Sequence, residues 1–216
     1  DLHSFPTRRT SDLLRRGPLL VYSRDPGQTP WLLLLLSHQI DQGDGQTLSR
    51  RLQFLHVPPE GEPFFAGWAP HLDLDSPSPE DLPLLQDLRE APWITRDLET
   101  RARTLAAATL AQDHYREVAA LHEDLLDRTL RAVNERLTKE IDSLTDRYGS
   151  LQEEEAAGQD RRLRKKSLHE RIEDLSQRLE NRRRELRNQR NLTNRAPAVL
   201  GAALVVPRGL LDARKG

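Results

Sequence analysis

The chain of 216 residues contains no cysteine and no methionine. Without cysteine it can form no disulfide, no thiolate nucleophile and no cysteine-based zinc site. Because methionine is missing even from the first position, we expect the chain to be a piece of a longer open reading frame. Residues 1–13 resemble translated sequencing-adaptor read-through, and we leave them out of the fold prediction.

Aromatic residues are scarce, and the charges nearly cancel. Apolar residues make up 36% of the chain and aromatic residues 5%, which predicts a modest core and suits elongated helices better than a globule. The net charge of −1 gives no overall field that would attract nucleic acid. Any charge-based function must therefore depend on local segregation of charge.

Long hydrophobic runs and phosphate-binding motifs are also missing. The apolar run Leu32–Leu36 is far too short to span a bilayer, so we expect a cytoplasmic protein with no membrane partner. There is no Gly-x-x-x-x-Gly-Lys-Ser/Thr loop. We therefore expect no ATP hydrolysis, no catalytic residue and no cofactor in this chain.

Residues 97–191 carry the strongest pattern. Apolar residues recur from Val118 through Leu121 and Leu125 at helical spacing, with one break at Leu130, which predicts a long amphipathic helix. After a weak segment at residues 156–160 the rhythm resumes, so a second helix is expected to fold back on the first. The predicted coiled-coil seam comprises Val133, Leu137, Ile141, Leu144, Tyr148, Leu151, Leu168, Ile172, Leu175, Leu179 and Leu186.

The register of this hairpin can be checked within the sequence. Antiparallel partners on either side of one turn have position numbers with a nearly constant sum, and pairs such as Leu144 with Leu175 give 319 or 320. Residues 134–160 hold three basic and eight acidic side chains, whereas residues 161–190 hold twelve basic and five acidic ones. These opposite charges favour pairing of the two arms, with Glu153–Glu155 opposite Arg164–Lys166 near the tip.

Strand patterns precede and follow the helices. The runs Leu19–Tyr22 and Trp31–Leu36 and the partly alternating stretch Thr47–Val57 are separated by turn residues, which predicts a small antiparallel sheet. A further apolar strand is expected at residues 198–206. Either this strand returns to the first sheet, making the helices an insertion, or it begins another domain; we favour the return.

The predicted fold class is α+β, a small antiparallel sheet with a long protruding antiparallel helical hairpin. The expected division is a disordered or artefactual tail at 1–15, a β region at 16–75, a linker with a short helix at 76–96, the helical arm at 97–195, and a returning strand with a truncated tail at 196–216.

Candidate chemical sites are few. His114 and His122 lie eight residues apart on one helix and could share a metal, but we favour ordinary helix-surface histidines because no third ligand is near in sequence. The alternating stretch His71–Asp75 is expected to be a solvated strand edge rather than a catalytic carboxylate pair. Trp31, Trp68 and Trp93 are expected to be core or docking anchors, since none lies in a basic run.

Several stretches resemble one protein family. They are Arg136–Ile141, Glu155–Gly158, the basic second arm and Ala196–Pro207, which resemble the region after the motor core of bacterial SNF2-type DEAD/DEAH-box helicases, including those near phage-defence loci. The segments Gly43–Arg51 and Trp68–Asp73 are similar to the region after the motor in RNA-polymerase-associated members. The resemblance spans residues 17–212. It implies a parent protein that binds ATP and Mg, but the family's functional residues lie in the motor and have no counterpart here.

Two functions remain open. The chain is either a non-catalytic C-terminal accessory region of an ATP-dependent helicase that contacts nucleic acid such as DNA or regulates the motor domains, or a coiled-coil module that docks protein subunits without binding nucleic acid. The opposing residues 129–137 offer Glu135 as their one acid, so the base of the second arm is less neutralised than the tip. The candidate phosphate contacts are Arg182, Arg183, Arg184, Arg187 and Arg190.

Overall fold

The computed structural model describes residues 17–216, so the predicted tail at 1–15 lies outside the described residues. The chain forms two compact units. The first, the sheet unit, contains the chain up to Ile40, Thr47–Arg116 and Asn194–Gly216. The second, the helical unit, contains Asp41–Gln46 and Glu117–Thr193.

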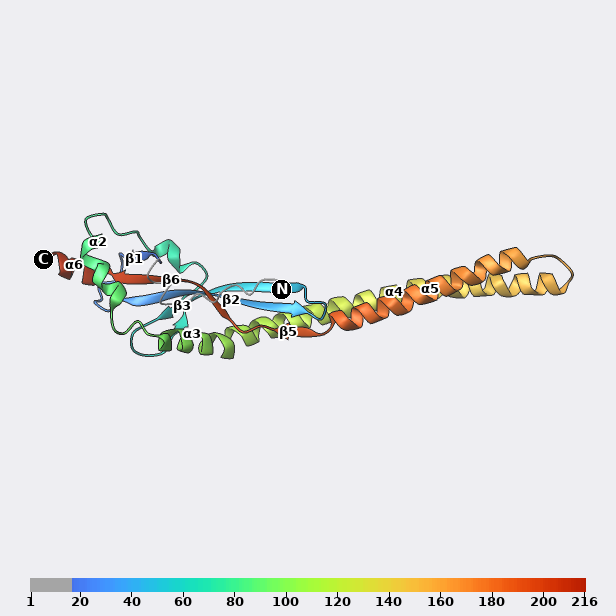
Figure 1. The fold of residues 1–216 in the computed structure, drawn as a ribbon, viewed down its shortest axis with the longest axis horizontal. Helices are drawn as coiled ribbons and strands as arrows, with labels where there is room; N and C mark the ends of the chain where they lie inside the picture. Colours follow the sequence, from blue (N-terminus) through green and yellow to red (C-terminus); the bar gives the residue numbers. More distant parts are fainter. Residues whose placement is uncertain (1–16) are drawn as a thin grey trace. The chain divides into compact units, whose positions relative to one another are not determined.

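A six-stranded sheet organises the sheet unit (Figure 1). Its strands are β1 (Leu19–Tyr22), β2 (Trp31–Gln42), β3 (Thr47–Val57), β4 (Phe64–Phe65), β5 (Leu192–Asn194) and β6 (Ala198–Pro207). The order is β1-β6-β2-β3-β4, with β5 pairing with β2 off this path. The strand that follows the helices therefore joins the N-terminal strands, which is the first of the two alternatives considered for it.

Strand β6 lies between β1 and β2. It is parallel to β1, with Leu19 opposite Leu204, and antiparallel to β2, with Trp31 opposite Val205. The prediction of an antiparallel sheet is therefore correct only in part, since β2 pairs with β6 and β3 with β4 in antiparallel orientation, whereas β1 pairs with β6 in parallel orientation. Its apolar residues explain this position, since Ala202–Val206 are all buried and require cover on both faces.

Local turn chemistry sets the β2–β3 connection. Gly45 has a φ of +84°, and the loop is closed by a hydrogen bond from the Gln42 amide to the Gln46 carbonyl. A glycine in the left-handed backbone conformation suits a tight hairpin loop, which the glycines and aspartates of this segment predict. Gly43 has a second constraint, because a Cβ there would lie 2.2 Å from the Asn188 carbonyl oxygen.

The stretch His71–Asp75 does not form the predicted strand. Pro70–Asp73 is a short 3-10 helix, η1, and Asp75 makes an isolated bridge with Val21. Proline near the start of this turn favours helical φ values, which overrides the alternating pattern. Asp73 pairs with Arg24 and Asp75 accepts a hydrogen bond from Ser23, so the two carboxylates have separate partners.

Ion pairs join several short helices of the sheet unit. These helices are α2 (Leu82–Leu85), η2 (Gln86–Glu90) and α6 (Arg208–Lys215), of which α6 was not predicted. Arg214 donates to both carboxylate oxygens of Asp87, and Lys215 lies 2.6 Å from Asp81. These hydrogen bonds hold the pKa of each aspartate below its usual value.

Helix α3 (Arg96–Ala108) belongs to the sheet unit, although its residues from 97 onward were predicted to be part of the helical arm. Leu98, Ala102 and Ala106 lie at helical spacing and are buried in the main core with Leu34 and Val206. Asp97 and Glu99 in the first turn interact favourably with the positive end of the helix dipole. Small alanines allow close approach of this helix to its neighbours.

Helix α4 (Leu110–Ala156) follows α3 after a bend at Thr109. The Thr109 backbone has φ −117° and ψ −73°, and its hydroxyl donates to the Leu105 carbonyl at 2.8 Å. A threonine hydroxyl bonded back to the preceding turn favours a bend. The two long helical segments are thus consecutive but not one straight helix.

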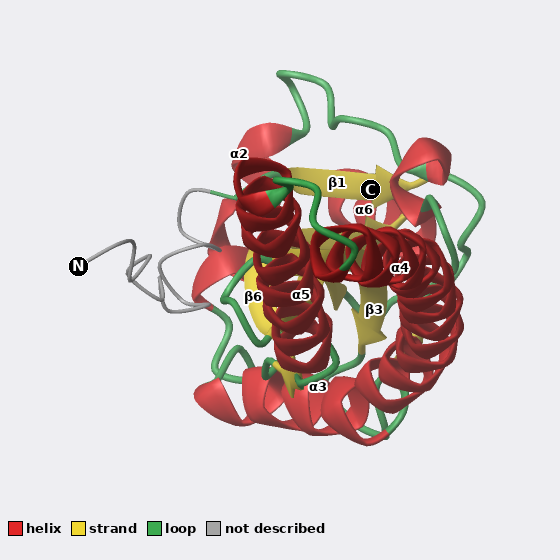
Figure 2. Ribbon diagram, turned by 90° about the vertical axis from the view of Figure 1, so that its right-hand side faces the viewer, coloured by secondary structure: helices red, strands yellow, loops and turns green. Residues whose placement is uncertain are grey.

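Helix α5 (Arg162–Gln189) lies antiparallel to α4 within the helical unit, as the yellow-green and orange ribbons of Figure 1 show. The connecting loop, green in Figure 2, includes Gly158 with a φ of +93°. The amides of Ala157 and Gly158 donate to the carbonyls of Glu153 and Glu155, so the loop satisfies the last carbonyls of α4. The predicted weak segment at 156–160 therefore contains the turn.

Candidate nucleic-acid interface

The residues predicted for the seam face the interior of the helical unit to different degrees. Leu151, Leu175, Leu179 and Leu186 are buried, and the other seven are half-buried. Leu121 and Leu125, which the periodicity placed in the same apolar pattern, are 67% and 60% exposed, so that part of the prediction was wrong.

In this part of α4 the buried side chains are His122 and Leu126, each of which follows one of the predicted leucines by one residue. The Nε2 atom of His122 donates to the Gln189 carbonyl oxygen at 2.9 Å. A buried polar group needs such a partner. Counting apolar residues alone could not find this register, because a histidine occupies one of its positions.

Ion pairs link α4 to the first turn of α5 and to Arg161, the residue before it, near the tip of the helical unit. Lys165 lies 2.6 Å from Glu155, and Arg161 lies 2.7 Å from Glu154. The hydrogen bond to Glu155 raises the pKa of Lys165. Charge at this end of the helical unit is therefore largely neutralised within the chain, as its charge pattern indicates.

The five candidate arginines lie near the other end of α5, and most have local partners. Arg182 donates to Glu185 at 2.9 Å and Arg183 to Glu180 at 2.7 Å. Arg183 also donates to Asn134, Arg184 to Asn181, Arg190 to Asp127, and Arg187 to the Arg183 carbonyl oxygen. These ion pairs are solvent-exposed, and such pairs typically contribute only about 0 to 1 kcal/mol.

Positive charge nevertheless exceeds negative charge in this part of the helical unit. Residues 124–139 and 178–190 together hold ten basic and five acidic side chains, an excess of +5. Some of these cations make no ion pair with any residue that the structure describes, namely Arg131, Arg136, Lys139, Arg184 and Arg187. A polyanion would find here both cations without an ion pair and cations in weak ion pairs.

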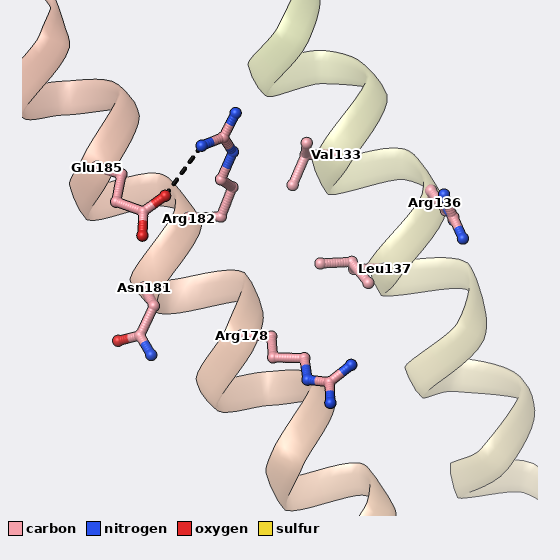
Figure 3. A pocket seen from close by; sticks show the side chains of 7 residues that line it. All are labelled: Val133, Arg136, Leu137, Arg178, Asn181, Arg182 and Glu185. Atoms are coloured by element: carbon pink, nitrogen blue, oxygen red, sulfur yellow. Dashed lines mark hydrogen bonds and ion pairs between the residues drawn. The ribbon is translucent and has the colours of Figure 1, made fainter.

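A groove of ≈ 460 Å³ lies between α4 and α5 in the same region. Val133 and Leu137 point from α4 toward α5, while Arg178 and Arg182 extend from α5 into the space between the helices (Figure 3). Arg136 lies at the outer side of α4, and Asn181 and Glu185 complete the lining. Neither Arg136 nor Arg178 was predicted as a phosphate contact. The constant sum could have indicated Arg136, since it places residue 136 opposite Arg183 and residue 137 opposite Arg182.

Acidic residues of α5 gather on a different face. Glu170, Glu173, Asp174 and Glu180 line one surface hollow with Ser176 and Gln177. Only Glu185 among the five acids of residues 161–190 lies in the basic groove instead. Charge is therefore segregated around α5 as well as along it, and a polyanion would be repelled from the acidic face.

A buried histidine pair in the sheet unit is the main feature that the sequence did not reveal. The Nδ1 atoms of His38 on β2 and His114 on α4 lie 2.7 Å apart, and the side chains are 2% and 1% exposed. Ser49 Oγ lies 2.8 Å from His114 Nε2, and Asn194 Oδ1 lies 2.5 Å from His38 Nε2. The prediction that His114 is a surface histidine was wrong, and His122 is buried too.

These contacts permit one consistent assignment of protons. Because Asn194 Oδ1 only accepts, His38 must donate from Nε2, which leaves its Nδ1 as an acceptor when the ring is neutral. His114 then donates from Nδ1 and accepts at Nε2 from the Ser49 hydroxyl. The four side chains thus form a directional chain of hydrogen bonds that joins β2, β3, α4 and β5.

An aromatic stack lies elsewhere in the sheet unit. The His56 ring stacks between Trp31 at 3.9 Å and Phe64 at 4.3 Å between ring centroids. Burial lowers the pKa of His56 to about 4, although Asp25 acts in the opposite direction. Trp31 and Trp93 contact the cores, as expected for anchors, whereas Trp68 is 82% exposed.

We expect His56 to make stability depend on pH. Its folded-state pKa lies below the unfolded value of 6.5, so the unfolded chain binds more protons between these values and stability falls as pH drops from 7 to 5. Allowing for its partial exposure, the loss should be about 1 kcal/mol. Urea denaturation at both pH values should show a smaller loss for His56→Phe, which keeps the stack without the titration. An equal loss in the variant would contradict this role.

No group of three or more metal-ligating side chains occurs among residues 17–216. Within the same residues, no helix is both long enough and apolar enough to cross a membrane. Comparison with known proteins identifies no relative: no protein-family model matches the chain, and neither a curated protein nor a solved structure matches it.

Proposed function

We propose that this chain is a non-catalytic accessory region of a cytoplasmic, ATP-dependent SNF2-type helicase, and that its helical unit contacts nucleic acid. The excess of +5 at residues 124–139 and 178–190 is the observation that carries the nucleic-acid contact. The assignment to a helicase depends on the resemblance of the sequence. ATP and Mg would be bound by the motor domains of the parent protein, which are the expected partners within it.

The arginines in ion pairs support this function as well as those without an ion pair. Their carboxylate partners are exposed, with Glu185 and Glu180 each 59% accessible at the side chain. A phosphate can therefore displace or share these partners at little cost, because exposed ion pairs are weak. Arginine also offers two parallel donors to a phosphate, which favours such an exchange.

We also propose that α4 and α5 pack as an antiparallel coiled coil that presents this basic surface. The buried or half-buried state of all eleven predicted seam residues supports it. The interhelical pair Lys165–Glu155, whose position numbers sum to 320, supports the same register. A stable helical pair would hold the backbone of the arginines in fixed positions, so that less backbone freedom is lost on binding.

Salt dependence tests the proposal. If the arginines contact phosphates, affinity should fall steeply between about 50 and 200 mM salt, with a slope near −0.9 per contact on duplex and −0.7 on single strands. Replacing Arg182, Arg183 and Arg184 with glutamine should weaken binding and reduce the slope by roughly two to three contacts. Fluorescence anisotropy with labelled oligonucleotides measures both quantities.

A matched control removes the same charge from the same helix. Replacing Arg162, Arg164 and Lys166 with glutamine changes net charge equally, but these residues lie near the tip, where acids are close. This variant should retain most of the affinity and slope. If both triple variants lose binding equally, overall charge rather than the proposed surface is responsible.

The alternative function, protein docking, is favoured by one observation in the sheet unit. Trp68 and Leu72 are 82% and 78% exposed, and Phe64 and Phe65 are also exposed. Exposed aromatic residues of this kind often serve as anchors for another protein. A docking module would bind no nucleic acid at low salt, or bind it without salt dependence, which is the result that would favour this alternative.

A further inference from the structure

The groove between α4 and α5 has a composition that duplex binding alone does not explain. Its floor is apolar, formed by Val133 and Leu137, and both side chains are half-buried rather than sealed inside the helical pair. Three guanidinium groups and one carboxylate surround that floor, a local charge of +2. A surface that only touched the phosphates of a duplex would gain nothing from partly accessible aliphatic side chains.

The size of the helical pair also limits how it can meet a duplex. One α-helix is about 10 to 12 Å across with its side chains, which already fills a major groove about 12 Å wide. Two helices side by side cannot enter that groove. Arg178 and Arg182 extend from α5 toward α4 and flank the groove instead.

A single strand offers both kinds of group that the groove can bind. Its phosphates complement the guanidinium groups, and its unpaired bases and sugars can cover apolar side chains or stack on guanidinium planes. The volume of ≈ 460 Å³ lies within the roughly 300 to 1,000 Å³ of ordinary ligand sites. Asn181 adds an amide that can donate to or accept from a base or a phosphate.

We propose that this groove binds single-stranded nucleic acid, with Arg178 and Arg182 on the phosphates and Val133 and Leu137 against the sugar or base. This inference rests on the proposed nucleic-acid function and specifies its ligand. Two ion pairs, Arg182–Glu185 at 2.9 Å and Arg178–Asp174 at 3.0 Å, must open or rotate to admit the strand, and both are exposed enough to do so. Binding should be largely independent of sequence, because the groove presents few directional groups for reading bases.

The test compares a labelled oligo(dT) strand of about 15 nucleotides with a duplex of the same length, using the full chain at about 100 mM salt. The single strand should bind at least about 10-fold more tightly. The double variant Arg178→Gln/Arg182→Gln should lower single-strand affinity about 10-fold and duplex affinity less than about 3-fold. The matched control, Arg162→Gln/Arg164→Gln, should leave the preference for the single strand unchanged.

A further variant probes the apolar floor without removing charge. Val133→Thr keeps the shape of the side chain, adds a hydroxyl and should lower single-strand affinity about two- to threefold while leaving duplex binding unchanged. Circular dichroism checks that the helices persist. Equal or tighter binding to duplex, with the salt response of the Arg182, Arg183 and Arg184 variant intact, would overturn this inference and leave the proposed function standing. Binding to neither nucleic acid would overturn both.

Discussion

Replacing His114 with leucine is expected to lower the free energy of unfolding by about 2 to 4 kcal/mol. The imidazole is 1% exposed and contacts Ser49 and His38 through its two ring nitrogens. Leucine has a similar volume but can neither donate to His38 Nδ1 nor accept from Ser49. The acceptor on His38 would remain buried without its donor, and an unsatisfied buried group costs more than a hydrogen bond contributes.

A double-mutant cycle distinguishes this cause from a simple loss of packing. Because His38→Leu/His114→Leu removes both partners of the 2.7 Å contact, it should cost less than the sum of the single changes, with a coupling of about 1 to 2 kcal/mol. His169→Leu, an exposed position on α5, should stay within about 0.5 kcal/mol of the parent chain. Additive losses at His38 and His114 would show that the network contributes no cooperative stability.

Replacing Leu175 with aspartate is expected to destabilise the helical unit by about 2 to 4 kcal/mol. Leu175 is 5% exposed, so the substitution would bury a carboxylate for which the predicted seam offers no cation. The carboxylate must either remain neutral at a raised pKa or force the helices apart. Thermal unfolding followed by circular dichroism at 222 nm should therefore begin at a lower temperature.

The same helix supplies the control, since Leu163 is 85% exposed. Leu163→Asp should change stability by less than about 0.5 kcal/mol. Independently, cysteines at Leu144 and Leu175 should form a disulfide within one chain if α4 and α5 have the proposed register. Crosslinks found only between chains would assign the seam to an intermolecular pairing, and equal effects of the two aspartates would place Leu175 outside a packed seam.

The long helices could be predicted because their signal is local. Residues such as Leu144 and Leu175 repeat at the period of one helix, and Gly158 marks the turn between the arms. The order of the sheet could not be read in this way. Each strand is visible as a short apolar run, but nothing in β1 or β2 shows that β6 lies between them, because that choice depends on the burial of the assembled strands.

The candidate site was predictable only in part for a similar reason. The run Arg182–Arg184 is conspicuous in the sequence, whereas Arg178 matters because of what it faces across the groove. His38, Ser49 and Asn194 come from three separate strands, and no spacing relates them to His114. Polar networks assembled from distant segments leave no periodic trace, so they become visible only after the chain has folded.

The position of β6 has a consequence for how the chain can fold. Leu19 pairs with Leu204, a separation of 185 residues, and β2 also pairs with β6. Such pairings give the sheet a high contact order, and the entropy of closing so long a loop opposes the early assembly of its centre. A helical hairpin needs only local contacts and forms on a faster timescale. Once α5 has folded back along α4, the effective loop that β6 must close is much shorter. The insertion that makes the sheet non-local thus also reduces the entropic barrier to completing it.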